Sequence, residues 1–93
     1  MKNKVLIKLI VPEVDSTFDL FIPTNELIWK IKKLVTKSIN DLTGDSLDMS
    51  KDYILINKLT GQIYQNNATI FNTDIRNATE LVLLLEKKIN KEK

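Results

Sequence analysis

Residues 69–85 read TIFNTDIRNATELVLLL, and they are the most informative stretch for the fold of this chain. Ile70 and Ile75 are isolated apolar residues in a segment with neither a helical nor a strand period, so we expect them to anchor an irregular loop. The segment ELVLLL at 80–85 is a predicted strand. A strand with one face exposed to solvent alternates apolar and polar residues, but this strand is apolar on both faces.

Two further strands are predicted at the start of the chain. In KVLIKLIVP, residues 4–12, the odd-numbered residues are all apolar, whereas the other face carries Lys8 between two aliphatic residues. The segment TFDLFIP, residues 17–23, follows after a few turn residues. Two such runs with a short turn between them predict an antiparallel hairpin.

A helix is predicted at 27–42, capped by Thr24 or Asn25 at its start and by Gly44 at its end. Residues 43–52 are expected to form a loop. YILIN, at 53–57, is a further predicted strand, and a turn at Gly61 leads to a short strand around Ile63. The apolar stripe of the helix comprises Ile28, Ile31, Val35, Ile39 and Leu42, widened by Leu27 and Leu34.

This order of elements predicts an α+β fold, a mixed four- to five-stranded sheet with one helix packed across it. The 93 residues are enough for one domain, 1–93. The absence of cysteine and histidine removes thiol nucleophiles, Ser-His-Asp arrangements and zinc sites, so we expect no enzyme activity, catalytic residue, cofactor or metal. A net charge of +2, with Arg76 as the only arginine, does not favour nucleic acid as a partner. No apolar run reaches a membrane span, and we expect a cytoplasmic protein.

The order and spacing resemble ubiquitin's β-grasp fold over about residues 4–86. The match is with the ubiquitin segment that leads into the final strand. In this resemblance Ile70 opens a short loop, Ile75 is buried in the core and Leu81 lies at the start of the final strand. Among ubiquitin-like proteins, residues 55–84 most resemble the YukD/EsaB-like proteins found beside the WXG100 (type VII) secretion apparatus of Gram-positive bacteria. The feature that supports this resemblance is the pair Asn57 and Lys58 after the third strand.

The resemblance implies that the last strand lies centrally, beside the first. It also implies a non-catalytic protein-interaction module, an accessory or regulatory part of type VII secretion. Conjugated relatives end in a glycine pair, whereas this sequence ends EKKINKEK, so we do not expect conjugation to targets. Residues 87–93 are expected to form a frayed, charged tail. The alternative is a small structural subunit or obligate homo-oligomer, such as a homodimer, that covers its own apolar face.

The candidate partner-binding site is the outer face of the sheet, away from the helix. Ubiquitin-like proteins commonly recruit partners through this face, and a cluster of large aliphatic residues on adjacent strands is typical of an interface. Scattered surface hydrophobic residues are the other interpretation, since much of any protein surface is apolar. The site is predicted to comprise Leu6, Ile10, Phe21, Leu55, Val82 and Leu84, with Leu55 and Leu84 at its centre.

Three other groups have both a functional and a structural interpretation. A lysine stripe on the helix could touch an acidic partner or a membrane surface, but such stripes are more often solvated. Trp29 is expected at the edge of the apolar stripe, where packing is favoured over ligand contact. The aspartates around the 43–52 loop do not have the spacing of a calcium loop, which favours solvated carboxylates. The lysine stripe comprises Lys30, Lys33 and Lys37, and the aspartates are Asp41, Asp45, Asp48 and Asp52.

Overall fold

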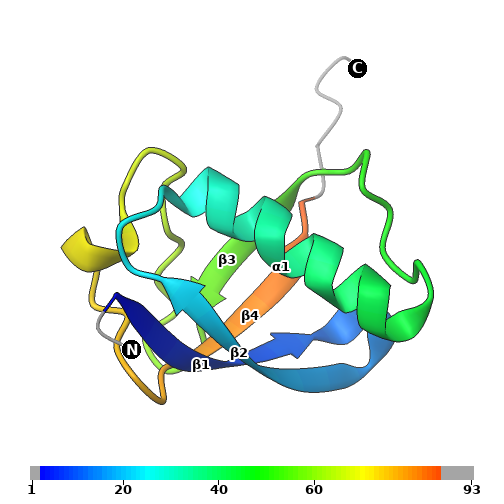
Figure 1. The fold of residues 1–93 in the computed structure, drawn as a ribbon, viewed down its shortest axis with the longest axis horizontal. Coiled ribbons are helices and arrows are strands. Elements are labelled where there is room, and N and C mark those ends of the chain that lie inside the picture. Colours follow the sequence, from blue (N-terminus) through cyan, green and yellow to red (C-terminus); the bar gives the residue numbers. More distant parts are fainter. Residues whose placement is uncertain (1–2, 87–93) are drawn as a thin grey trace.

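A computed structural model describes residues 3–86 of the chain, and the predicted charged tail at 87–93 lies outside the described residues. The fold is α+β, as predicted, with one α-helix packed across a mixed sheet (Figure 1). In the described part of the chain the elements are β1 (Lys4–Val11), η1 (Pro12–Val14), β2 (Ser16–Pro23), α1 (Ile28–Thr43), β3 (Tyr53–Asn57), η2 (Ile70–Asn72) and β4 (Glu80–Leu85).

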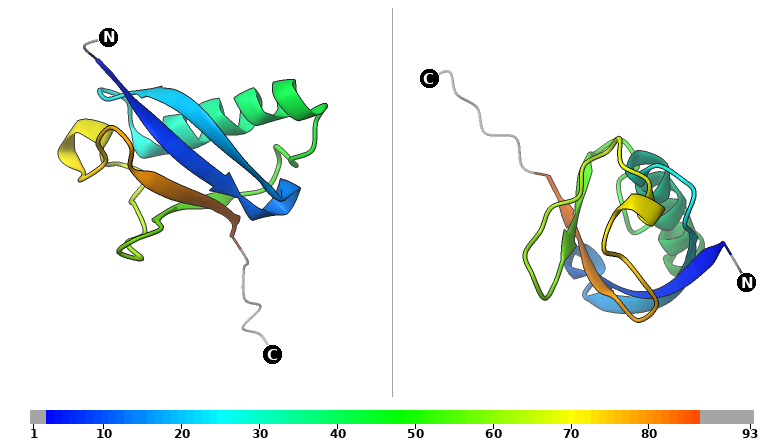
Figure 2. Two further views of the ribbon diagram at one scale, coloured as in Figure 1. Left: turned by 90° about the horizontal axis from the view of Figure 1, so that it is seen from below. Right: turned by 90° about the vertical axis from the view of Figure 1, so that its left-hand side faces the viewer.

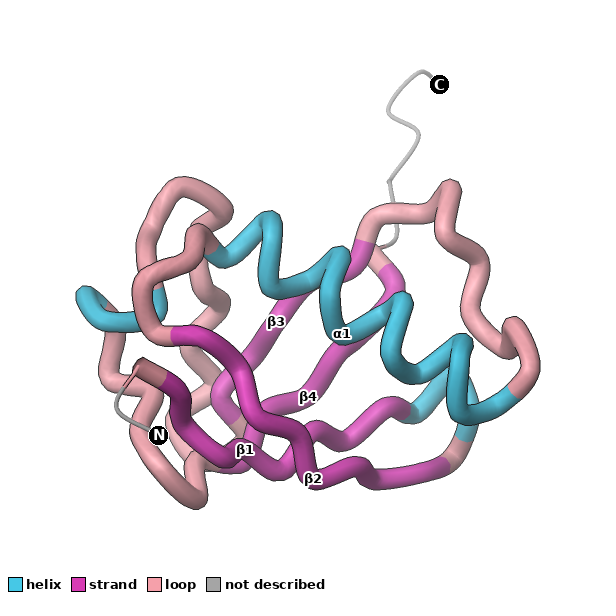
Figure 3. The backbone as a smooth tube through the Cα atoms, in the orientation of Figure 1, coloured by secondary structure: helices cyan, strands magenta, loops and turns pink. Residues whose placement is uncertain are grey.

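The sheet has four strands in the order β2-β1-β4-β3, so the last strand is central and lies beside the first (Figure 3). β1 and β2 form the predicted antiparallel hairpin, β1 and β4 run parallel, and β3 pairs antiparallel with β4. The predicted short strand around Ile63 is reduced to a single bridge with Ile56. The apolar residues on the two faces of β4 have different surroundings, since Leu81 and Leu83 are buried in the core and Val82 and Leu84 are half-buried on the opposite face.

Helix α1 starts later than its sequence predicts. No side chain caps its N-terminus, and the amides of Ile28 and Trp29 instead donate to the carbonyls of Ala68 and Asn66. The predicted cap at Thr24 or Asn25 is therefore wrong, because a loop that follows β3 supplies the acceptors that the first turn needs. Thr24 is engaged elsewhere, since its amide and hydroxyl both donate to the carbonyl of residue 3.

The predicted cap at the other end of α1 is confirmed. Gly44 adopts φ +76° and donates its amide to the Asn40 carbonyl, a left-handed ending that glycine adopts at little cost. The Asn40 side chain is buried and forms two hydrogen bonds with the backbone of Leu47, accepting at 2.7 Å and donating at 3.0 Å. This pair holds the loop after α1 against the helix, and Leu47 itself is buried in the core.

Helix α1 lies across one face of the sheet (Figure 2), and most of its predicted apolar stripe is buried. Leu34 and Leu42 are exceptions, since both are exposed. The buried residues recur at the three- and four-residue spacing of a single helix face, and Leu34 and Leu42 lie outside the area that the sheet covers. The apolar residues of α1 in the core are Ile28, Ile31, Val35 and Ile39.

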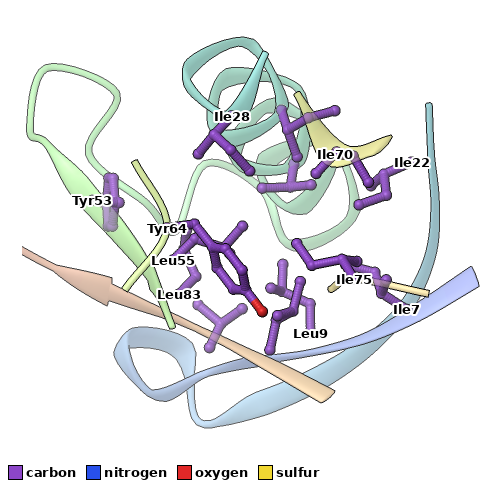
Figure 4. Packing of buried hydrophobic residues seen from close by; sticks show 14 of the residues in the cluster. Ile7, Leu9, Ile22, Ile28, Tyr53, Leu55, Tyr64, Ile70, Ile75 and Leu83 are labelled. Atoms are coloured by element: carbon purple, nitrogen blue, oxygen red, sulfur yellow. The ribbon is translucent and has the colours of Figure 1, made fainter. Parts of the chain in front are cut away.

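The irregular segment between β3 and β4 closes one end of the core (Figure 4). Ile70 and Ile75 are completely or almost completely buried, which confirms that they anchor this loop. Tyr64 is also buried, and its hydroxyl accepts from the Asn57 amide at 3.0 Å and donates to the Asp74 carboxylate. These two hydrogen bonds satisfy the phenol inside the core and connect β3 to the loop.

Candidate interaction surface on the outer face of the sheet

Four aliphatic side chains lie in one row across the outer face of the sheet. Ile10 of β1 lies opposite Val82 of β4, and Val82 lies opposite Ile56 of β3. Ile63 extends the row through its bridge to Ile56. The row therefore crosses three strands and ends on the segment beyond β3. Contiguity across strands distinguishes it from scattered surface hydrophobic residues.

A second, shorter row lies beside the first. Leu84 of β4 faces Ile54 of β3, one pleat along from Val82 and Ile56. Ile63 is 56% exposed, and the other members of the two rows are half-buried. Together they form what we call the aliphatic patch, which comprises Ile10, Ile54, Ile56, Ile63, Val82 and Leu84.

The prediction that Leu55 lies on this face is wrong. Leu55 is 1% exposed and points into the core beside Leu83, to which it is paired (Figure 4). Its neighbours Ile54 and Ile56 are the outward-facing residues of β3. Because YILIN has apolar residues at odd and even positions, its own pattern does not reveal which set faces inward.

Leu6 and Phe21 do lie on the outer face, where they are 39% and 55% exposed and form a pair across β1 and β2. A row of charged residues separates them from the aliphatic patch. In this row Lys8 lies between Asp19 and Glu80 in the register. The six predicted residues therefore fall into three groups: Ile10, Val82 and Leu84 in the patch, Leu6 and Phe21 beyond the charged row, and Leu55 in the core.

The charged row continues to Lys58, whose ammonium group forms an ion pair with Glu80 at 3.3 Å. Its signs alternate across the four positions from Asp19 to Lys58. Each charge thus has an opposite neighbour, which is the favourable arrangement for cross-strand pairs. A partner that docks on the aliphatic patch would meet this row along one border, where it would fix orientation more than affinity.

A cleft of about 400 Å³ adjoins the charged row where β3 ends and β4 begins. Its walls include Asn57, Thr79 and the ion-paired Lys58 and Glu80. Leu59, which is 91% exposed, forms part of its lining.

Asn57 and Lys58, the pair that supports the sequence resemblance, have structural contacts that account for them. The Asn57 side-chain oxygen accepts from the amides of Leu59 and Thr60, and its amide donates to Tyr64. Asn57 thus organises the turn, while Lys58 pairs with Glu80. The turn also explains Gly61, which adopts φ +79°.

The loop carboxylates do not assemble into a metal site in residues 3–86, where no group of three or more potential ligands is found. Asp48 instead accepts from the hydroxyl and amide of Ser50, and these hydrogen bonds lower the pKa of its carboxyl. The described residues contain no helix long and apolar enough to cross a membrane.

No protein-family model matches the sequence, and neither does any curated protein. Solved structures do match the fold. The chain is 18% identical to the C-terminal ubiquitin-like domain of human 2'-5'-oligoadenylate synthetase-like protein, with a TM-score of 0.65 and coverage of 100% of this chain and 95% of that one. For the ubiquitin-like domain of Plasmodium falciparum Dsk2 the identity is 12%, the TM-score 0.68 and the coverage 89% and 99%.

A third similar structure is a chain of the MycP5-free ESX-5 inner membrane complex. The identity is 12% and the TM-score 0.72, and the match covers 98% of this chain but 23% of that one. At such identities the likeness concerns the fold. Together with the helix packed on a four-stranded mixed sheet, it establishes that this chain has the ubiquitin-like β-grasp fold.

Proposed function

We propose that this chain is a non-catalytic interaction module that binds a protein partner through the aliphatic patch. The observation that carries the proposal is the patch itself, six aliphatic side chains contiguous over β1, β4, β3 and the segment at Ile63. A partner that covers these side chains gains about 25 cal/mol for each Å² of apolar surface removed from water. The bordering charged row then selects a partner with complementary charges.

We further propose that the module acts in the cytoplasm as an accessory or regulatory component of a type VII (WXG100) secretion system. Two observations support this role: the resemblance of residues 55–84 to YukD/EsaB-like proteins, and the structural likeness to a chain of the ESX-5 inner membrane complex. The partner would then be a component of the secretion apparatus.

The binding proposal is tested by site-specific photocrosslinking in cells. A photoreactive amino acid at Val82, in the patch, should crosslink to one dominant protein, and the same amino acid at Ser38, exposed on α1, should not crosslink to that protein. The crosslink should disappear when Leu84→Asp is introduced together with the probe. A Val82 probe that forms no crosslink, or forms the same crosslinks as the Ser38 probe, would contradict the proposal.

The secretion proposal needs a separate experiment, since a patch can bind a partner of another kind. Deletion of the gene should reduce export of WXG100 substrates. Wild-type protein and the Ser38→Asp control should restore export, whereas Leu84→Asp should not. Unchanged export in the deletion strain would refute the secretion role and leave the binding role standing.

Size measurement of the pure protein addresses the alternative, a homo-oligomer that covers its own patch. A monomer agrees with a foreign partner. A stable dimer that Leu84→Asp dissociates would show that the patch is occupied by a second copy, and would replace the proposal.

A further inference from the structure

A second candidate surface lies on the other side of the molecule, along the solvent side of α1. Two hollows adjoin there and share Trp29 and Lys33. One is a pocket of about 140 Å³ between α1 and the chain that enters β3, with Met49, Lys51 and Tyr53 in its walls. The other is a groove of about 360 Å³ on α1 and the residues just before it.

The groove is lined by residues at helical spacing. It lies between two rows with a four-residue spacing, Glu26, Lys30 and Leu34 on one side and Trp29, Lys33 and Lys37 on the other. Helices commonly pack by placing the ridge of one helix into the groove between such rows of the other. The groove therefore favours a helical occupant.

The charge of the surface is positive. Three lysines line the groove, and the pocket adds Lys32 and Lys51 together with one carboxylate, Asp52. Glu26 lies 3.9 Å from Lys30, and Asp41 lies 3.6 Å from Lys37, but these pairs are largely exposed to solvent and are weak. Among residues 3–86, Lys33 forms no ion pair. A partner with carboxylates would complement this surface.

The surface also exposes three large apolar side chains. Trp29 is 40% exposed, Leu34 47% and Met49 51%. The Lys30 ammonium group lies 5.7 Å from the centre of the Trp29 ring, so one side of the ring is already paired with a cation. Within the pocket, Lys32 donates to the Tyr53 carbonyl at 2.7 Å. The Trp29 and Met49 side chains remain accessible for an apolar side chain of the partner.

We propose that this surface binds an acidic amphipathic helix of a protein partner. An apolar side chain of that helix enters the pocket beside Trp29 and Met49, and its carboxylates meet the lysines that line the groove. A planar lipid surface does not fill a pocket, and the carboxylates of Glu26 and Asp41 interrupt the positive field that a phosphate backbone requires. The site is separate from the aliphatic patch, so the module can bind two partners at once.

The experiment uses a synthetic probe peptide, a helix of glutamates with leucines at every third or fourth position. Trp29 is the only tryptophan of the chain and reports directly on its own surface. Binding of the peptide should shift Trp29 emission to shorter wavelength, saturate, weaken as salt is added and perturb the amide NMR signals of Trp29, Lys33 and Met49. A peptide with serines in place of the leucines should bind at least tenfold more weakly.

Matched variants locate the binding. Lys33→Glu and Met49→Asp should each weaken the leucine peptide at least tenfold while their melting temperatures stay near that of wild type. Lys4→Glu, the same charge change on an exposed residue of β1, should have less than a threefold effect. Leu84→Asp should also leave peptide binding unchanged, which separates this proposal from the one for the patch.

Four results would overturn the inference. The first is no shift of Trp29 emission at millimolar peptide, and the second is that the serine peptide binds as tightly as the leucine peptide. The third is that Lys4→Glu weakens peptide binding as much as Lys33→Glu does. The fourth is an emission shift with phosphatidylglycerol vesicles but not with the peptide. The last would assign the surface to an anionic membrane.

Discussion

Adjacent leucines of β4 should respond in opposite ways to the same substitution. Leu83 is fully buried among the core residues, whereas Leu84 is half-buried on the outer face. In Leu83→Asp, loss of the buried side chain costs about 2 to 5 kcal/mol. A carboxylate buried without a partner adds several kcal/mol more. Small domains are held together by about 5 to 15 kcal/mol in total, so this variant should be unfolded at neutral pH.

Leu84→Asp places the new carboxylate where it can remain in water. Complete burial of a leucine is worth about 1.5 to 3 kcal/mol, so loss of a half-buried one should cost about 1 kcal/mol. For a domain of this size that corresponds to a melting temperature lower by about 4 to 8 °C. If the patch is an interface, association should weaken by at least about 2 kcal/mol, or roughly thirtyfold in affinity.

Circular dichroism melts of the two variants and a sizing or binding assay on Leu84→Asp test this reasoning. Unfolding of both variants would mean that the outer face is packed against part of this chain. A folded Leu83→Asp would mean that the assignment of the two faces of β4 is wrong. A Leu84→Asp protein that is stable and loses no association would make the patch ordinary surface.

Three further predictions concern the core. Leu55→Asp should unfold the protein while Ile56→Asp stays folded in thermal melts, and the reverse result would refute the register of β3. Asn40→Ala leaves the buried backbone groups of Leu47 without partners and should cost about 1 to 3 kcal/mol in chemical denaturation, and an unchanged free energy of unfolding would contradict this role of Asn40. Burial and the Asp74 hydrogen bond raise the pKa of Tyr64 to about 12, from 10.0 in the unfolded chain. Because the folded state favours the protonated phenol, this stabilisation is complete below pH 10 and is lost as the pH rises from 10 to about 12. Stability curves over this range should fall more steeply for wild type than for Tyr64→Phe, and parallel curves would contradict the assignment.

The sequence alone determined the order and type of the main elements. Its period changes from two in β1 and β2 to three or four in α1, and this change reflects local geometry that every strand or helix shares. Ile70 and Ile75 were identifiable as anchors because no local period explains an isolated isoleucine in a polar loop. The resemblance to ubiquitin placed β4 beside β1, and the parallel register of the two strands confirms it.

Only the tertiary structure decided which residues share a surface. The faces of β3 follow from its register with β4, since its own apolar residues fit either orientation. Likewise, the charged row depends on which residues of β2, β1 and β4 lie opposite one another. The position of Lys8 in the sequence does not show that its side chain separates Leu6 and Phe21 from the patch.

The start of α1 was also set by tertiary contacts, because carbonyls from Asn66 and Ala68 take the place of a local cap. Similarly, Leu34 and Leu42 fit the helical period but lie beyond the reach of the sheet. In each case the deciding partner is distant in the sequence. A local pattern records which side chains avoid water, but long-range packing determines which of them are covered.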